Sequence, residues 1–210
     1  MRDRRSPLTP SDVPALAWDR TDGLLPAAVQ DAHSGRLLML GYMDQAALGA
    51  TLASGVATFC RPEQRPGQDG EAGGGQGLRV SAVHEDCDAD ALVVLAVPEG
   101  PTCHAGGQSC FAGEADGPGW LAELSRVVKE QARSGPDTSY TRWLLGEGAQ
   151  RIAQKVGQEG VEVALAAVSR DQGRVAEEIA DLLFHVTVLM EARDLAWSDV
   201  VRLLRRRHLS

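Results

Sequence analysis

The 210-residue chain has few cysteines and no long hydrophobic run. Four cysteines, at positions 60, 87, 103 and 110, are too few for a small domain held together by disulfides. The longest apolar runs, such as residues 91–97, are much shorter than the ~20 residues of a membrane span. No apolar segment of the signal-peptide type follows the charged N-terminus. We therefore expect a cytoplasmic protein without a membrane partner, whose cysteines are reduced thiols or metal ligands.

An excess of positive charge is also absent. The chain has 21 Lys and Arg residues against 29 Asp and Glu residues, a formal net charge of −8, and its only lysines are Lys129 and Lys155. This balance argues against a nucleic-acid partner bound through a basic surface. With 43% hydrophobic and 24% charged residues, the composition is that of a globular protein. What remains is an enzyme or a binding module of one or two domains.

Short apolar runs dominate residues 23–111 and predict strands, listed here by range: 24–30, 36–42, 78–83 and 91–97. Ser34-Gly35 predicts a hairpin turn, and Asp44 is placed to cap a short helix over residues 45–52. The first 22 residues are polar and contain three prolines, which indicates a loose arm or peripheral elements. The glycine-rich segment 66–77 predicts a flexible loop, and it lacks the Gly-Lys-Ser/Thr ending of a P-loop.

A segment rich in Gly, Ala and acidic residues, 112–119, separates this half from a helical one. Helical patterns follow over residues 120–133, 149–168, 174–193 and 199–208, with a short segment at 141–148. We therefore expect an α+β, β-rich domain over residues 1–113 and an all-α domain over residues 118–210.

The acidic motif at residues 84–90, His-Glu-Asp-Cys-Asp-Ala-Asp, precedes a predicted strand. In an extended chain Asp86, Asp88 and Asp90 would share one face, with Cys87 on the other. Carboxylates crowded in this way repel one another unless a cation lies among them, and hard oxygen ligands suit Mg²⁺ or Ca²⁺. The alternative is a solvated acidic turn.

Cys87, Cys103 and Cys110 could fill three positions of a tetrahedral zinc site and leave the fourth for water. Cys60 or His104 could instead supply a fourth ligand, which would make the site structural. Their spacing differs from the paired Cys-x-x-Cys of zinc ribbons. The spacing indicates zinc and leaves its role open.

Residues 23–111 resemble phosphoribosyl-AMP cyclohydrolase. The matching stretches are residues 29–31, 38–43, 84–90, 100–104 and 109–111. The resemblance implies that Cys87, Cys103 and Cys110 bind Zn²⁺ shared between the subunits of a dimer. It also implies that Asp86, Asp88 and Asp90 bind Mg²⁺.

The same resemblance implies a reaction in which zinc-activated water attacks C6 of the adenine ring and the N1–C6 bond opens. His104 is the candidate for moving the proton, and its alternative role is to orient the loop. The family usually carries Trp-x-Lys-Gly-Glu where residues 67–71 read Gly-Gln-Asp-Gly-Glu. Arg65 and Glu71 remain as candidate substrate-binding residues. Because Asp69 would repel a phosphate, a weakened cyclohydrolase half is the alternative.

Two pairs of acidic residues mark the helical half. Glu159 and Glu162 are three residues apart, as are Glu178 and Asp181, so each pair shares a helix face. Two antiparallel helices would bring the four carboxylates together, and such a cluster requires neutralisation. Oxygen-only ligands favour Mg²⁺, which suits the binding of a triphosphate and its attack by water. Ordinary solvated helix faces are the alternative.

This half resembles phosphoribosyl-ATP pyrophosphatase, an all-α relative of the MazG-type pyrophosphohydrolases. The matches are residues 139–141, 144–145, 155–157, the two acidic pairs, 184–185 and 206–208. The resemblance implies that Glu159, Glu162, Glu178 and Asp181 hold Mg²⁺, with Glu159 and Glu162 as catalytic residues, and that Lys155 faces phosphate. Position 158, usually Glu in the family, is Gln158, so we expect an activity that is tuned and not lost.

The order of the two halves matches the bifunctional histidine-biosynthesis enzymes. The C-terminal half would cleave phosphoribosyl-ATP to phosphoribosyl-AMP and pyrophosphate, and the N-terminal half would then open the adenine ring. We expect a homodimer that requires Zn²⁺ and Mg²⁺. Two rival interpretations are an interaction module stabilised by structural zinc and a housecleaning pyrophosphatase that acts on ordinary nucleotides.

Overall fold

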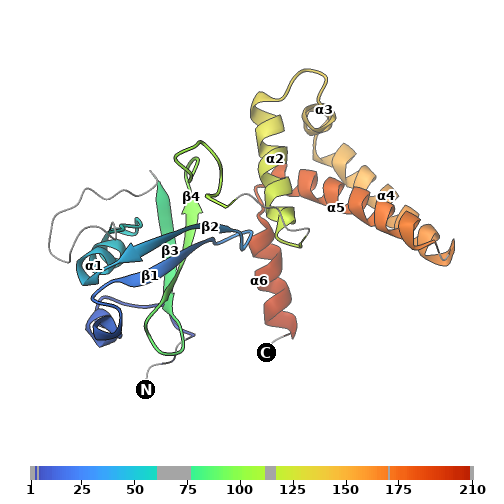
Figure 1. The fold of residues 1–210 in the computed structure, drawn as a ribbon. Helices are drawn as coiled ribbons and strands as arrows, with labels where there is room; N and C mark the ends of the chain where they lie inside the picture. Colours follow the sequence, from blue (N-terminus) through green and yellow to red (C-terminus); the bar gives the residue numbers. More distant parts are fainter. Residues whose placement is uncertain (1–2, 4, 61–76, 112–116, 170, 209–210) are drawn as a thin grey trace. The chain divides into compact units, whose positions relative to one another are not determined.

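The computed structural model describes residues 3, 5–60, 77–111, 117–169 and 171–208 (Figure 1). The chain divides into two compact units, Met1–Ala115 and Asp116–Ser210. Arg65, Glu71 and the 67–75 segment, to which we assigned substrate contacts, lie outside the described residues. Among the residues that are described, no helix has the length and apolar character needed to cross a membrane.

A four-stranded sheet forms the first unit, in the order β2-β1-β4-β3 (Figure 1). Strands β1 (Leu25–Asp31) and β2 (Leu37–Met43) form one antiparallel pair, and β3 (Leu78–Glu85) and β4 (Leu92–Pro98) form the other. The parallel pairing of β1 with β4 joins them. The predicted strands are thus confirmed, and β2 and β3 are the edges of the sheet.

Local signals in the sequence determine how the sheet is connected. Gly35, with φ of +73°, supplies the left-handed residue of the β1–β2 turn, as Ser34-Gly35 predicted. Helix α1 (Gln45–Ser54) begins where the Asp44 carboxylate accepts the Ala47 N–H at 2.7 Å, which confirms the predicted cap. Alternate residues of β1 and β4 are buried in the core together with α1.

The N-terminal segment is packed against this core. Leu8, Val13, Leu16 and Trp18 are all buried, and two short 3₁₀ helices, η1 (Val13–Ala15) and η2 (Trp18–Arg20), carry part of the segment. The Trp18 indole donates to the Val13 carbonyl at 2.7 Å. Of the two expectations for this segment, peripheral elements are therefore correct and a loose arm is wrong, because apolar side chains recur between its prolines.

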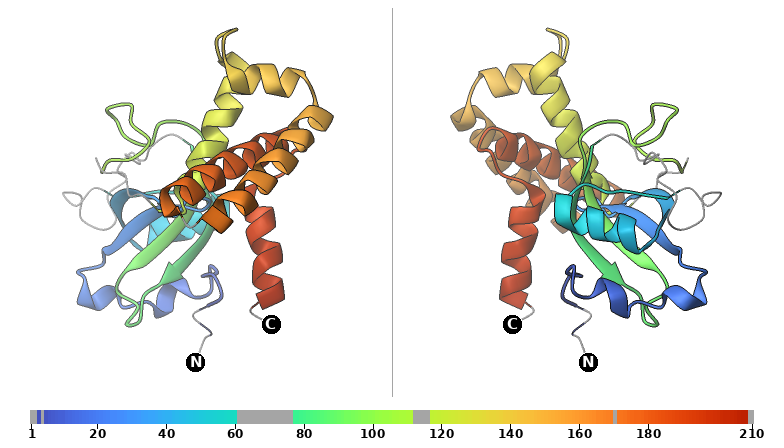
Figure 2. Two further views of the ribbon diagram at one scale, coloured as in Figure 1. Left: turned by 90° about the vertical axis from the view of Figure 1, so that its right-hand side faces the viewer. Right: turned by 90° about the vertical axis from the view of Figure 1, so that its left-hand side faces the viewer.

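The second unit is all-α, as predicted. Its helices are α2 (Trp120–Ser134), α3 (Tyr140–Gly146), α4 (Ala149–Ser169), α5 (Gln172–Glu191) and α6 (Trp197–His208). Helices α4 and α5 lie side by side, and theirs is the most extensive helix–helix contact of this unit (Figure 2). Asp171 caps the N-terminus of α5, where its carboxylate accepts hydrogen bonds from the N–H groups of Gly173 and Arg174. Val128, Leu144, Ile152 and Val188 form the core between α2, α3, α4 and α5.

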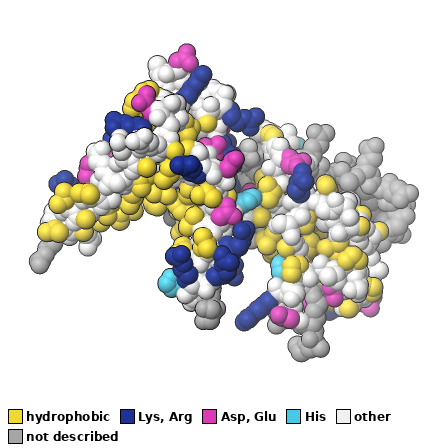
Figure 3. Space-filling model, turned by 180° about the vertical axis from the view of Figure 1, so that it is seen from behind, with side chains coloured by type: hydrophobic (Ala, Val, Ile, Leu, Met, Phe, Trp, Pro, Cys, Tyr) yellow, Lys and Arg dark blue, Asp and Glu magenta, His cyan; other side chains and the backbone are white. Residues whose placement is uncertain are grey.

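Apolar side chains gather over α4 and α5 on the outside of this unit (Figure 3). Val161, Leu165 and Val168 on α4 are 59%, 64% and 82% exposed, and Ile179 on α5 is 40% exposed. Helix α6 buries none of its residues. An exposed apolar patch of this kind is typical of an interaction surface.

Candidate functional site

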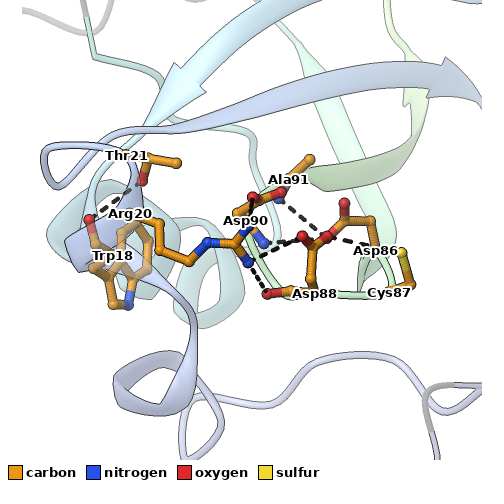
Figure 4. Close-up of polar contacts among 8 residues, drawn as sticks. All are labelled: Trp18, Arg20, Thr21, Asp86, Cys87, Asp88, Asp90 and Ala91. Atoms are coloured by element: carbon orange, nitrogen blue, oxygen red, sulfur yellow. Dashed lines mark hydrogen bonds and ion pairs between the residues drawn. The ribbon is translucent and has the colours of Figure 1, made fainter.

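The acidic motif forms a turn between β3 and β4 (Figure 4). The Asp86 carboxylate accepts the N–H groups of Asp90 at 3.1 Å and Ala91 at 3.3 Å. Ala89 takes a left-handed conformation, with φ of +63°. The expectation that Asp86, Asp88 and Asp90 alternate along an extended chain is therefore wrong, because the Asp86 side chain satisfies the N–H groups of a tight turn instead.

Arg20, from η2, bridges the two remaining carboxylates of this turn. Its guanidinium lies 2.9 Å from the Asp88 carboxylate and 3.2 Å from the Asp90 carboxylate (Figure 4). The hydrogen bond from Arg20 lowers the pKa of Asp88 below its usual value. Asp88 and Asp90 therefore already share a cation that the chain itself supplies.

Cys87 lies with these carboxylates and not on the opposite side as expected. Its thiol is 3.7 Å from the Asp88 carboxylate, and one ligand atom each from Asp86, Cys87 and Asp88 falls within 4.8 Å of the others. All three residues are exposed. The turn thus presents a mixed sulfur and oxygen donor set to the surroundings.

The other two cysteines lie on the loop that follows β4. The Cys103 N–H donates to the Gly107 carbonyl and the Cys103 carbonyl accepts from Gly106, which closes a tight turn. At the far end of the loop, Ser109 Oγ donates to the Leu37 carbonyl at 2.8 Å, and the Cys110 N–H donates to the Leu38 carbonyl at 2.8 Å. The edge strand β2 therefore anchors the loop and positions Cys110.

The thiols of Cys103 and Cys110 are neighbours. Burial raises the pKa of Cys110 above its usual value, and the Cys103 thiol raises it further by hydrogen bonding and by charge. Within the described part of the chain, Cys87 shares its three-ligand cluster with aspartates and not with these two thiols. His104, next to Cys103, is exposed. Cys60, considered above as a possible fourth ligand, packs against the core.

The acidic pairs of the helical unit converge between α4 and α5. Glu159 is only 5% exposed, and one carboxylate oxygen each from Glu159, Glu178 and Asp181 lies within 4.8 Å of the others. Desolvation raises the pKa of Glu178, and the negative charge of Glu162 raises it further. The four carboxylates come together as the spacing predicted.

Lys155 and Gln158 lie along the same face of α4. The Lys155 ammonium is 3.9 Å from the Glu159 carboxylate and donates to the Gln158 side-chain carbonyl at 3.2 Å. The Gln158 amide nitrogen in turn donates to the Glu162 carboxylate at 2.9 Å. Glutamate at position 158 could not donate this bond and would repel Glu162, so glutamine fits this arrangement.

Sequence reasoning assigned no role at this site to His185. This side chain is buried, and its Nδ1 lies 2.9 Å from the Asp181 carbonyl and 3.7 Å from the Glu159 carboxylate. A signal was available, since positions 178, 181 and 185 follow one helix face. Arg20 offered no comparable signal, because 68 residues separate it from its partner Asp88.

Both donor sets fit the metals that the sequence suggested. The four carboxylates between α4 and α5 meet two cations, Lys155 at 3.9 Å from Glu159 and Arg174 at 3.7 Å from Glu178. The cluster therefore keeps an excess of negative charge, and its oxygen donors suit Mg²⁺. Paired thiols suit Zn²⁺.

Comparison with known proteins places the two units in two classes of nucleotide hydrolase. Residues 39–112 match the family model for phosphoribosyl-AMP cyclohydrolase, and residues 121–208 match the one for phosphoribosyl-ATP pyrophosphohydrolase.

Relatives that contain both units in one chain match almost the whole length. The histidine biosynthesis bifunctional protein HisIE of Shewanella oneidensis is 44% identical over 201 residues, 95% of this chain and 94% of that protein. The proteins of the same name from Escherichia coli strain K12 and Salmonella typhimurium are each 46% identical over 202 residues, 96% of this chain and 99% of theirs. The chain belongs to the family of bifunctional histidine biosynthesis proteins, which confirms the resemblance.

Proposed function

We propose that the chain catalyses two successive hydrolyses of histidine biosynthesis. The helical domain, residues 118–210, cleaves phosphoribosyl-ATP to phosphoribosyl-AMP and pyrophosphate, and the β-rich domain, residues 1–113, opens the adenine ring of phosphoribosyl-AMP. The observation that carries the proposal is the convergence of buried Glu159 with Glu178 and Asp181 inside the segment that matches the pyrophosphohydrolase family. Near-full-length similarity to bifunctional relatives disfavours an interaction module and a general nucleotide pyrophosphatase.

In the helical domain, Glu159, Glu162, Glu178 and Asp181 would hold Mg²⁺. The ion, when bound, neutralises phosphate charge and polarises the phosphorus–oxygen bond under attack. Glu159 and Glu162 are the catalytic candidates, because they occupy the same α4 face as the cation that would meet phosphate. That cation is Lys155, whose ammonium lies at the rim of the carboxylate cluster.

In the β-rich domain, Cys103 and Cys110 would hold Zn²⁺ together with Cys87 of a second copy. The ion, when bound, lowers the pKa of water and polarises the ring carbon that water attacks. The placement of Cys87 apart from the other two thiols supports sharing between copies. His104, exposed beside Cys103, would move the proton.

Asp86, Asp88 and Asp90 would hold Mg²⁺ in the same domain. Because Arg20 pairs with two of these carboxylates in the metal-free chain, the ion has to compete with the guanidinium for their oxygens. Arg65 and Glu71 remain the proposed substrate-binding residues.

The same observations support a homodimer. Val161, Leu165 and Val168 present an apolar face along α4 that a second copy would cover, and a shared zinc site requires a second copy as well. Biosynthetic relatives support a cytoplasmic enzyme that acts on small molecules.

A coupled assay tests the proposed reactions. Purified full-length protein receives phosphoribosyl-ATP with Mg²⁺ and Zn²⁺, and pyrophosphate release and ring opening are followed separately. We expect both products, and a chelator should abolish both. No pyrophosphate release would overturn the proposal. Ring opening of directly supplied phosphoribosyl-AMP decides whether the first domain is weakened.

Subunit mixing tests the shared zinc site. Cys87→Ser and Cys103→Ser proteins are each inactive in ring opening, but a mixed dimer contains one intact site. Unfolding and refolding the two variants together should restore about a quarter of the wild-type activity, because half of the dimers are mixed and each has one good site of two. No recovery would place all three cysteines in one subunit.

A further inference from the structure

We infer that His185 and Tyr140 form a positioning pair that orients the carboxylate of Glu159 for the metal. This inference rests on the proposed pyrophosphohydrolase function and adds two residues to that site. His185 lies beside the Glu159 carboxylate and Tyr140 contacts His185, and neither one is an acidic ligand.

His185 joins the helices that build the site. From α5, its Nδ1 lies 2.9 Å from the carbonyl of Asp181, one turn earlier, and 3.7 Å from the Glu159 carboxylate on α4. Its Nε2 lies 3.1 Å from the hydroxyl of Tyr140 on α3. One imidazole therefore connects three helices.

Hydrogen-bond chemistry fixes which nitrogen carries the proton. A carbonyl oxygen can only accept, so Nδ1 must carry the hydrogen that it donates to Asp181. The Glu159 carboxylate lies 3.7 Å from the same nitrogen, beyond hydrogen-bond distance. In the neutral ring Nε2 then accepts from the Tyr140 hydroxyl. Tyr140 thus selects the tautomer with the hydrogen on Nδ1, which holds the ring against the Asp181 backbone carbonyl and next to the Glu159 carboxylate.

Burial and ring packing hold the His185 side chain in one orientation. The side chains of His185 and Glu159 are only 8% and 7% exposed, so water has little access to either partner. The His185 ring packs edge-on against Phe184 with centroids 5.2 Å apart, and the Tyr140 ring stacks on Phe184 at 6.2 Å. A packed ring holds its N–H in one place, which is what orienting a metal ligand requires.

Substitutions separate the hydrogen bonds from the packing. His185→Leu removes both nitrogens, whereas His185→Asn keeps an N–H near the position of Nδ1. Tyr140→Phe removes only the hydroxyl and keeps the ring contacts. The chain has one other tyrosine, so Tyr42→Phe in the β-rich domain is a matched control, and His33→Leu in an exposed turn controls for the loss of a histidine.

The first readout is Mn²⁺ affinity, followed by electron paramagnetic resonance with full-length protein. The signal of this site is the one that Glu159→Gln abolishes. We expect His185→Leu to weaken Mn²⁺ binding about 10- to 100-fold, as is usual when a partner of a metal ligand is lost. His185→Asn should recover most of this loss, Tyr140→Phe should show a smaller weakening, and the two controls should match the wild type.

Kinetics provide the second readout. At saturating Mg²⁺ the variants should approach the wild-type kcat, whereas the Mg²⁺ concentration for half-maximal rate should rise with the loss of affinity. A merely structural role would lower the melting temperature without moving the metal dependence.

The outcomes distinguish this inference from the proposed function. If the wild type shows no Mn²⁺ signal that depends on Glu159, the proposed metal site itself fails. If the wild type binds but folded His185→Leu binds equally well, only the positioning role is wrong. Should His185→Leu not fold, Tyr140→Phe decides, because unchanged Mn²⁺ affinity in that variant overturns the pair.

Discussion

The two domains gather their metal-binding residues in opposite ways. In the helical domain, spacings of three residues place the acidic groups on facing sides of α4 and α5, and a single chain brings them together. In the β-rich domain, the thiols sit on two loops, with Cys87 in one cluster and Cys103 and Cys110 in another. A site built on helices is complete through local periodicity, whereas a site built on loops can be divided between two molecules.

The electrostatics of the two acidic clusters differ as well. Arg20 partly neutralises the β3–β4 turn and lowers the pKa of Asp88, whereas desolvation and neighbouring Glu162 raise the pKa of Glu178. Both clusters keep an excess of negative charge, since Lys155 and Arg174 lie 3.9 Å from Glu159 and 3.7 Å from Glu178, but the helical cluster contains a buried carboxylate, so water screens its repulsion less. The metal-free helical domain should therefore respond more strongly to metal than the acidic turn.

The largest expected effect separates the two activities. Cys103→Ser should lower ring opening about 1,000-fold or more, because a thiolate ligand of the proposed zinc is lost, while pyrophosphate release stays at the wild-type rate. Separate assays of the two products and the zinc content per chain check this. Cys60→Ser, at a packing cysteine, is the control. Equal loss of both activities would contradict the independence of the two sites.

Glu159→Gln should have the opposite selectivity to Cys103→Ser. Pyrophosphate release should fall about 100- to 1,000-fold, since the most buried ligand candidate loses its charge, and ring opening should persist. The melting temperature of the metal-free protein should rise, because one charge leaves a repulsive cluster. Glu177→Gln, at an exposed neighbour, should change neither quantity. A drop in melting temperature would show that Glu159 stabilises the metal-free domain.

A pH dependence sharpens the electrostatic comparison. Because the folded-state pKa of Glu178 is raised, ionised Glu178 disfavours the folded state above that pKa, and this penalty disappears as the pH falls through it. The melting temperature of metal-free protein should therefore gain more on acidification from pH 7.5 in the wild type than in Glu178→Gln. Calorimetry across the pH series measures this, and identical slopes would refute it.

The hydrogen bonds of the Asp86 side chain should contribute to the stability of the acidic turn. Asp86→Ala removes the acceptor of two backbone N–H groups and should cost about 1 kcal/mol of unfolding free energy. Urea denaturation of full-length protein measures the change, with Asp19→Ala as an exposed control. No loss of stability would show that water replaces the Asp86 carboxylate at no cost.

Arg20→Gln should give the smallest change. Its ion pairs are exposed and contribute little to stability, so the denaturation midpoint should barely move. Mg²⁺ should bind to the turn a few-fold more tightly, because a competing cation is gone. Isothermal titration in a Glu159→Gln background, which silences the other site, detects this. Weaker binding would mean that Arg20 organises the ligands and does not compete for them.

Local signals predicted most of the fold and the grouping of the acidic residues on α4 and α5. Asp44, Ser34-Gly35 and the two acidic pairs act within a few residues, so their effects can be read from spacing alone. The acidic turn was missed because the Asp86 side chain forms hydrogen bonds with backbone groups, which a rule about alternating strand faces ignores. Arg20 reaches its partner only after the sheet has formed, so spacing cannot reveal it.

The anchoring of the cysteine loop on β2 also protects the protein from aggregation through strand pairing. Strand β2 is an edge of the sheet, with Leu37 and Leu40 42% and 53% exposed, and open edges of this kind template aggregation. Ser109 and Cys110 occupy the carbonyls of Leu37 and Leu38, so another strand cannot pair there. The loop proposed to carry the zinc therefore also guards against misassembly, and its release would threaten solubility as well as catalysis.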